Sequence, residues 1–581
     1  MRMMTTSSKP YTLTLRDFRQ GRYIPTSVTN FLAPENSVKD ALNVDFDKIV
    51  GSVQVRLGTT LLGAAVASGK TPLGNFTFVG HNGSPNLNLV VFKGTTNATL
   101  YYFDTAWHAS DQTGLSNTAK TRFATLGGRV FMTNTVDGMK SSVDGATWTT
   151  DDCIPSGLAK PAFIYRYGAR LLAAGDPTYP DRVFFSSIID PTSTPFITWA
   201  MTVSRAYTND PIAGTNIALN MSDTSGFIVG NTVTVSSSAG SEAATIVSLV
   251  ANTSITVNAL DLDHTTTNPL VKQAGDYIDI NPDDGGIFSG FSETSTYILA
   301  LKNTGMYRMD TINKTADPNN IYNIGAVSQE AITICQGITY FFSGIDVRRT
   351  NGGFPEEISR AGVQDIIDAI PQANWGNVAL GTDGLNVYAS VGTVTLRTGQ
   401  NNQKTITNCV LKFSTRDQNW TIYSYAQNFQ FFSQLTNTNG QLLLGADTSG
   451  NVQMINYGTT DNGTVINYNL ELQDLEFGNR GHLKQISDQI TVFMKNGSGS
   501  RIQCRENGSV TPKDIPMKTI DDVNIGEDIN LKGYYLNFIW YGESSGTAPI
   551  FEGIFLENIM KFNFLQMTET KIDFKTQGSM V

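Results

Sequence analysis

A short apolar strand, a turn rich in Gly, Asp and Asn, and a second strand recur along most of this 581-residue chain. The clearest copies begin at Phe184, Tyr297, Tyr340, Asn386 and Leu442. Strand pairs that repeat every few tens of residues are typical of small β-sheets stacked in series. A radial arrangement of such sheets is one way in which a long all-β chain protects its sheet edges. We therefore expect an all-β fold built on a β-propeller.

The length exceeds what one hydrophobic core supports, so several domains are expected. Residues 201–275 interrupt the repeat, because Thr, Ser, Val and Asn dominate there and aromatic residues almost vanish. Beyond residue 460 the alternating strands become longer, which favours a β-sandwich. The predicted division is an N-terminal anchoring segment at 1–60, a first propeller part at 61–200, an inserted small β-module at 201–275, a second propeller part at 276–460 and a C-terminal β-sandwich platform at 461–581.

Two short helices are expected. One lies within 31–47, is capped near Asn36 and leads into a strand, and the other spans 361–370. A hairpin is expected at Ser142–Trp148, which resembles the Asp-box hairpin of many propellers with one residue missing between Asp144 and Gly145. This hairpin places Trp148 in the packed foot of a blade and carries no catalytic implication.

Charge and cysteine content exclude several classes of protein. With 41 basic and 51 acidic residues, the net charge of −10 is unlike that of proteins that grip duplex DNA. Cys153, Cys335, Cys409 and Cys504 lie far apart and are expected to be free thiols. The polar N-terminus lacks a signal-peptide pattern, and no apolar stretch is long enough to span a membrane. We expect synthesis and folding in a reducing cytoplasm.

Two catalytic motifs fail on spacing. The stretch 63–71 approaches a phosphate-binding loop, but G-x-x-x-x-G-K-T requires Gly where Ala64 stands, and Pro72 disfavours the helix that should follow Thr71. The stretch 497–499 lacks the first glycine of a G-x-S-x-G nucleophile elbow. Neither nucleotide chemistry nor serine hydrolysis is therefore expected.

Metal ligands are equally sparse. His81, His108, His264 and His482 are dispersed, and the one dense polar stretch, 261–264, reads as a solvated loop rather than a metal site. Asp283 and Asp284 read as a turn. We expect no enzyme activity and no catalytic, cofactor-binding or metal site, although a carboxylate pair contributed by two different blades would leave no trace in linear spacing.

The order of several phrases resembles the propeller-type tail proteins of short-tailed bacteriophages. The N-terminal phrase of that family, "N-v-d-f-d … G … R-x-G-t", is matched by 43–47, Gly51 and 56–59. Similar middle phrases lie at 165–177, 182–186 with Trp199, 324–327, 340–344 and 358–359, and similar closing strands at 533–536 and 551–554. The resemblance covers most of the chain except 201–275, which is itself similar to small β-modules that decorate tail proteins.

The resemblance implies a virion protein that forms the tail nozzle or hub, with no cofactor. Such a protein is a homohexameric ring below the adaptor ring; it conducts double-stranded DNA without binding it specifically and anchors fibres, spikes or a plug. It belongs to the virion tail and is assembled in the host cytoplasm. The insert makes the chain longer than a minimal nozzle, so its attachment partners stay open.

Two other classes of function stay open. One is a host-receptor or glycan-binding tail protein, possibly depolymerising, in which a propeller face holds the glycan. The other is a non-viral secreted sugar-binding propeller, against which the polar N-terminus argues. Ring symmetry distinguishes them, since a sixfold ring with an axial channel favours the nozzle.

Overall fold

The structure is a computed structural model, and nearly all of its elements are β-strands. Among the described residues the exceptions are one short α-helix, α1 (Gln364–Asp368), and two 3₁₀ helices, η2 (Gln329–Ala331) and η3 (Gln372–Asn377). The all-β prediction is confirmed. The structure describes residues 11–23, 37–79, 86–150, 160–189, 197–199, 202–282, 284–295, 297–310, 315–397, 403–437, 440–475, 482–486, 489–497, 499–507, 509, 511–520, 523–526 and 530–563.

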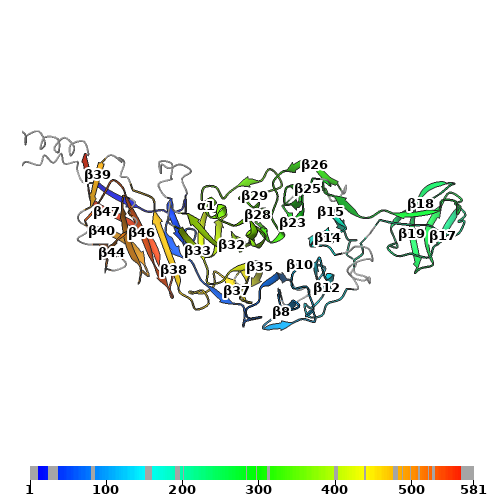
Figure 1. Cartoon of the computed structure of the whole chain (residues 1–581), viewed down its shortest axis with the longest axis horizontal. Helices are drawn as coiled ribbons and strands as arrows, with labels where there is room; N and C mark the ends of the chain where they lie inside the picture. The colour runs from blue at the N-terminus through cyan, green and yellow to red at the C-terminus, as the bar shows by residue number, and fades with distance from the viewer. Residues whose placement is uncertain are drawn as a thin grey trace, which may run out of the picture.

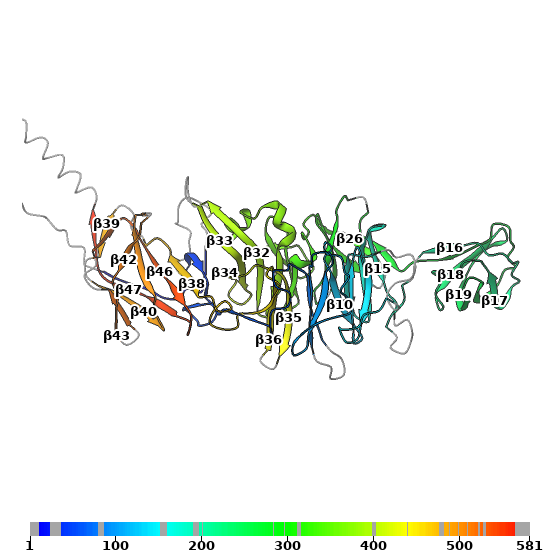
Figure 2. The ribbon, with the colours of Figure 1, turned by 60° about the horizontal axis from the view of Figure 1, so that its bottom comes forward.

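Seven antiparallel groups of strands, here called the central groups, occupy the middle of the molecule between the two ends seen in Figures 1 and 2. The first three are β6–β9 (Pro72–Phe78, Leu87–Phe92, Thr99–Phe103, Trp107–Ala109), β10–β12 (Arg122–Leu126, Arg129–Asn134, Gly138–Ser142) and β13–β15 with β22 (Phe163–Tyr167, Arg170–Asp176, Tyr179–Phe185, Tyr277–Asp279). The next two are β23–β26 (Phe288–Glu293, Ile298–Lys302, Met306–Asp310, Thr315–Tyr322) and β27–β30 (Ile332–Cys335, Ile338–Phe342, Val347–Thr350, Glu356–Glu357). The last two are β31–β34 (Ala379–Thr382, Asn386–Arg397, Gln403–Ser414, Asn419–Ser424) and β35–β37 with β5 (Phe429–Asn437, Gly440–Asp447, Val452–Ile455, Thr59–Leu61).

The first strands of the central groups contact one another in a cyclic order. β6 contacts β10, β10 contacts β13, and the series continues through β23, β27, β31 and β35, which contacts β6 again. The group that ends this series takes its outer strand from the N-terminal part of the chain, because β5 pairs with β37 at Thr59↔Ile455 and Leu61↔Gln453. Chain segments almost 400 residues apart are thereby joined in one sheet.

The N-terminal strands are incorporated into two large sheets at the C-terminal end. In the first of these sheets, the strand order runs from β31–β34 through β2 (Val38–Leu42), β38 (Ile466–Leu472), β46 (Leu536–Ser544), β41 (Arg501–Glu506) and β42 (Lys513–Ile515). The second contains β1 (Tyr11–Leu15), β3 (Val44–Asp45), β4 (Val53–Val55), β39 (His482–Ile486), β40 (Ile490–Lys495), β43 (Lys518–Ile520), β44 (Val523–Gly526), β45 (Leu531–Gly533) and β47 (Ile550–Asn563). Buried side chains of both sheets, including Leu470 and Trp540 of the first and Val492 and Phe551 of the second, form one hydrophobic core.

Residues 203–273 form a sheet of their own, here called the insert sheet, at the opposite end of the molecule (Figures 1 and 2). Its strands are β16 (Val203–Arg205), β17 (Gly214–Asn220), β18 (Thr232–Ser237), β19 (Gly240–Val250), β20 (Ser254–Leu260) and β21 (Leu270–Gln273). None of these described strands pairs with a strand outside the set. The predicted alternation holds in β18, where Val233 and Val235 are buried and Thr232 and Thr234 are exposed.

One local prediction is wrong and another is confirmed. The helix expected within 31–47 is absent from residue 37 onward, where β2 pairs with β38 in antiparallel and β34 in parallel fashion. The spacing of Val38, Ala41 and Leu42 suits a helix, but pairing on both strand edges outweighs that local preference. The helix expected at 361–370 is present as α1.

Candidate functional site

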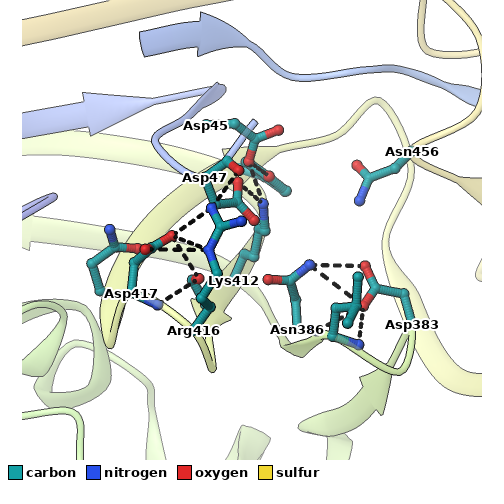
Figure 3. A network of polar contacts seen from close by, with 12 residues as sticks. Asp45, Asp47, Asp383, Asn386, Lys412, Arg416, Asp417 and Asn456 are labelled. Atoms are coloured by element: carbon teal, nitrogen blue, oxygen red, sulfur yellow. Dashed lines mark hydrogen bonds and ion pairs between the residues drawn. The ribbon is translucent and has the colours of Figure 1, made fainter. Parts of the chain in front are cut away.

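A buried polar cluster, here called the junction, lies where the N-terminal strands meet β33, β34 and β38. It consists of Asn43, Asp45, Arg56, Lys412, Tyr423 and Asp461, and part of it is shown in Figure 3. Asn43 separates β2 from β3 with a left-handed backbone (φ 59°), a conformation that Asn tolerates better than most residues. This turn sends the chain from one large C-terminal sheet to the other.

The Asn43 side chain holds three segments together. Its Oδ1 accepts hydrogen bonds from Arg56 Nε at 2.8 Å and from the Ser424 backbone N–H at 2.7 Å. Its Nδ2 donates to the Asn467 carbonyl at 2.6 Å. One amide therefore joins the N-terminal segment to β34 and β38.

Arg56 uses all five of its N–H donors in this cluster. Besides Asn43, its guanidinium contacts both carboxylate oxygens of Asp461 at 2.8 and 2.7 Å, and the carbonyls of Leu57 at 2.9 Å and Ser424 at 2.7 Å. It also lies over the Tyr425 ring, 4.1 Å from the centroid. The Arg56 side chain is 0% exposed and that of Asp461 5%, so each charge depends on the other. Burial opposes the charged form of Arg56, but the bonds to Asp461 outweigh it and raise its pKa.

Lys412 is the second buried cation of the junction. Its Nζ lies 2.6 Å from Asp45 and 2.8 Å from Asp47, and the Tyr423 hydroxyl donates to Asp45 (Figure 3). Burial alone would raise the pKa of Asp45, but attraction from Lys412 and the bonds from Lys412 and Tyr423 lower it. Burial alone would lower the pKa of Lys412, but the two carboxylates raise it. Both partners therefore stay ionised in the interior.

A polar chain extends from the junction towards the last central group. Tyr388 donates to Asp383 at 2.7 Å and accepts from Asn456 Nδ2 at 2.7 Å. Asn386 Nδ2 also donates to Asp383, at 3.1 Å (Figure 3). Because Asn456 follows β37 and Tyr388 lies on β32, this chain links two neighbouring central groups.

A second buried ion pair connects the N-terminal segment to helix α1. The guanidinium of Arg22, whose side chain is 6% exposed, reaches Asp365 at 2.9 and 2.6 Å and the Gly362 carbonyl at 2.6 Å. Asp40 of β2 lies 3.5 Å from Arg22 and also binds Lys404 of β33. Burial works against the charge of Asp40, but Lys404 and Arg22 lower its pKa.

The chemistry of the junction is that of a structural contact. Arg56 and Lys412 each face a carboxylate, and the donors of Arg56 are all used. Gly58 lies against the Thr460 carbonyl, which a Cβ at position 58 would overlap. The tail-protein phrase at 43–47 and 56–59 thus coincides with the residues that join the N-terminal segment to the central groups and to the C-terminal sheets.

The phosphate-loop-like stretch 63–71 packs against a turn of the last central group. The Ala67 and Gly69 backbone N–H groups donate to the carbonyls of Gly450 and Ser449 at 3.0 and 2.8 Å. In the Asp-box-like hairpin, Asp144 accepts from the backbone of Ala146 and Thr147, both at 2.9 Å. These two stretches therefore have structural roles.

The prediction of a solvated loop at 261–264 is wrong for His264, which is 1% exposed. Its Nε2 lies 2.8 Å from Glu242 Oε1 and its Nδ1 3.0 Å from Ser237 Oγ, because the β18–β19 hairpin brings those residues beneath the loop.

Asp284, which the sequence placed in a turn, accepts a hydrogen bond from the fully buried Lys302 at 2.8 Å. Within the described residues, no group of three His, Cys, Asp or Glu side chains could hold a metal ion, and no helix is long and apolar enough to cross a membrane.

The structure does not describe every residue named in the sequence analysis. Cys153, His81, Asp283 and Ser498 lie outside the described residues. The other three cysteines, Cys335, Cys409 and Cys504, are buried free thiols. Burial raises the pKa of the Cys504 thiol to about 12, as expected for an unreactive core position.

No family model matches this sequence, and neither does any protein with curated annotation. Among solved structures, the computationally designed Ika8 protein is 8% identical, with a TM-score of 0.33, and the match covers 67% of this chain and 98% of that one. The phage phi92 endosialidase is 10% identical, with a TM-score of 0.25, and the match covers 91% of this chain and 76% of that one. Similarities at such low TM-scores carry no argument about function.

Proposed function

We propose that this chain is a structural virion protein that forms the tail nozzle or hub of a short-tailed bacteriophage. In this role the seven central groups are the blades of a closed β-propeller, and the two C-terminal sheets are a β-sandwich platform. The cyclic contacts among first strands and the pairing of β5 with β37 support the propeller, because an N-terminal strand in the last blade closes the ring by hydrogen bonding. The shared core of the two C-terminal sheets supports the sandwich.

The junction is the observation that carries the proposal. Three of its buried residues, Asn43, Asp45 and Arg56, lie in the phrase by which the sequence resembles tail proteins. Their contacts to Asn467, Asp461 and Lys412 join the N-terminal segment to the C-terminal sheets and to the central groups. Breaking one buried ion pair of this kind costs about 3–5 kcal/mol. A protein that conducts DNA under pressure needs its parts to stay fixed, and this junction meets that need.

The charge balance suits a conduit. A net charge of −10 gives duplex DNA little reason to bind, since tight binding needs many Lys and Arg contacts to phosphates. In an assembled ring, the lumen should therefore carry at least as many Asp and Glu as Lys and Arg. We also propose that the protein is not an enzyme, because no catalytic motif in the sequence has the required spacing.

The assembly of the purified chain tests the nozzle. Mass photometry and negative-stain averages should show a homohexameric ring with an axial channel, able to bind an adaptor ring and tail fibres or spikes. Immunogold labelling of virions should place the chain at the distal end of the tail. A monomer or trimer, or label elsewhere on the particle, would contradict the nozzle and favour a receptor-binding tail protein.

A further inference from the structure

A cavity of about 200 Å³ lies where the first strands of the central groups converge. Its walls come from β6, β10, β13, the η2–β27 segment, β31 and β35, so six of the seven central groups contribute. Five aromatic side chains dominate the lining, and two amides, Asn75 and Gln329, contribute to it; the aromatic residues are Phe76, Phe123, Tyr165, Phe431 and Phe432. Asn75 and all of the aromatic residues except Phe431 are partly exposed, so solvent reaches the cavity.

The two charged side chains of the cavity lining, Arg122 and Glu330, are paired with each other. Glu330 lies 3.0 Å from both Lys120 Nζ and Arg122 Nε, and its side chain is 6% exposed. Lys120 also donates to the Gly376 carbonyl at 2.7 Å, and Arg122 donates to the Ala162 carbonyl at 3.1 Å. Lys120 lies outside the lining, and within the lining Arg122 and Glu330 balance each other, so the lining itself carries no net charge.

Two polar groups in the lining lack partners. Asn75 Oδ1 accepts from Asn88 at 3.0 Å, but the buried Asn75 Nδ2 has no partner among the described residues. The Tyr165 hydroxyl has no hydrogen bond to a described residue either, and burial raises its pKa, so it stays a protonated donor. A buried donor without a partner is costly, because it has lost its hydrogen bond to water. A ligand that accepts from both donors would recover that energy.

We propose that this cavity binds one neutral pyranose unit of a carbohydrate. The C–H face of a pyranose ring is apolar and suits the aromatic walls, where Phe76 and Phe123 are stacked with centroids 5.7 Å apart. Its hydroxyl oxygens accept hydrogen bonds from Asn75 Nδ2 and from the Tyr165 hydroxyl. Ligand sites combine apolar walls with a few such polar groups. The volume of about 200 Å³ has room for several water molecules, so one sugar unit suits the cavity in size. This site is independent of the tail role.

Saturation-transfer NMR and calorimetry on the full chain would test the proposal, with free glucose, galactose, mannose and N-acetylglucosamine as probes. At least one probe should bind saturably. Tyr165→Phe should weaken that binding about tenfold by removing one hydrogen bond. Tyr167→Phe is the matched control, because Tyr167 lies on the same strand but is 37% exposed and outside the cavity lining, and it should change affinity less than twofold.

Asn75→Asp is a second variant that removes the free donor but keeps the acceptor for Asn88, and it should weaken binding at least as much as Tyr165→Phe. Unchanged melting temperatures establish that each variant is folded. The proposal is overturned if no neutral probe binds at tens of millimolar, if only charged sugars bind, or if Tyr165→Phe and Tyr167→Phe bind alike. Failure here would leave the hexameric ring untouched, since assembly is measured separately.

Discussion

The two ends of this molecule are attached to the central groups in opposite ways. The C-terminal sheets share hydrogen-bonded strands with β31–β34 and bury ion pairs such as Arg56–Asp461 at the boundary. The insert sheet shares no described strand with the rest. Its ends meet where the Gly275 N–H donates to Thr202 Oγ1 at 3.3 Å, and its pair Arg205–Asp223 lies within the insert region itself and is partly exposed.

The difference indicates which parts of the chain move together. A buried ion pair that loses one partner leaves an uncompensated charge, which is a strong penalty against separation. An exposed pair contributes at most about 1 kcal/mol. The C-terminal sheets should therefore behave as one body with the central groups. The insert sheet, which shares a hydrophobic cluster with β10–β15 but no strand, should open at a lower free energy.

The largest expected effect follows from breaking the junction. Arg56→Met should destabilise the central groups and the platform by about 3–5 kcal/mol, because Asp461 then stays buried without a counter-charge. In a thermal scan the main transition should fall by about 3–5 °C. Arg205→Met, the same change at the exposed pair of the insert sheet, should shift its transition by no more than about 1 °C. Equal shifts in the two variants would show that the buried pair at the junction is worth no more than an exposed pair within the insert sheet.

Acid should destabilise the central groups through protonation of Glu330. Burial opposes the charge of Glu330, but Arg122 and Lys120 lower its pKa to about 2 from 4.5. A lowered pKa stabilises the folded protein above pH 4.5, and that contribution, about 3 kcal/mol, is lost as the pH falls from 4.5 to 2. The main transition should therefore drop across this range.

Glu330→Gln checks this origin of the acid sensitivity. The variant should be less stable at pH 7, and its main transition should depend less on pH between 4.5 and 2 than that of the wild type. Differential scanning calorimetry over this range measures both. A wild-type transition that does not change over the range, or a variant with the same slope, would exclude Glu330 as the source.

Excision of the insert sheet should have the smallest effect. Replacing residues 203–274 with a short Gly-Ser linker joins two positions that already touch, and few residues outside the module lose a hydrogen bond. The main transition should move by less than about 2 °C, with the insert transition gone. A large loss of stability would show that the insert sheet supports the central groups.

Local patterns predicted much of the fold, as in the buried strand residues 340–342 and 410–413, because strand alternation and turn residues are visible in adjacent positions of the sequence. The junction could not be predicted in this way. Arg56 and Asp461 are 405 residues apart, and Lys412 and Asp45 are 367 apart, so only the folded chain brings them together. The burial of His264 was missed for the same reason, because Glu242 reaches it through a hairpin.

Native-state hydrogen exchange of the full chain under increasing denaturant tests the central claim most directly, because it resolves which strands open together. Peptides from β2, β34 and β46 should exchange through one shared opening with the same denaturant dependence, while peptides from β18 and β19 should open in a separate step of lower free energy. If β2 and β46 exchanged independently of β34, or if β18 and β19 joined the shared opening, the platform and the central groups would not form one body distinct from the insert sheet.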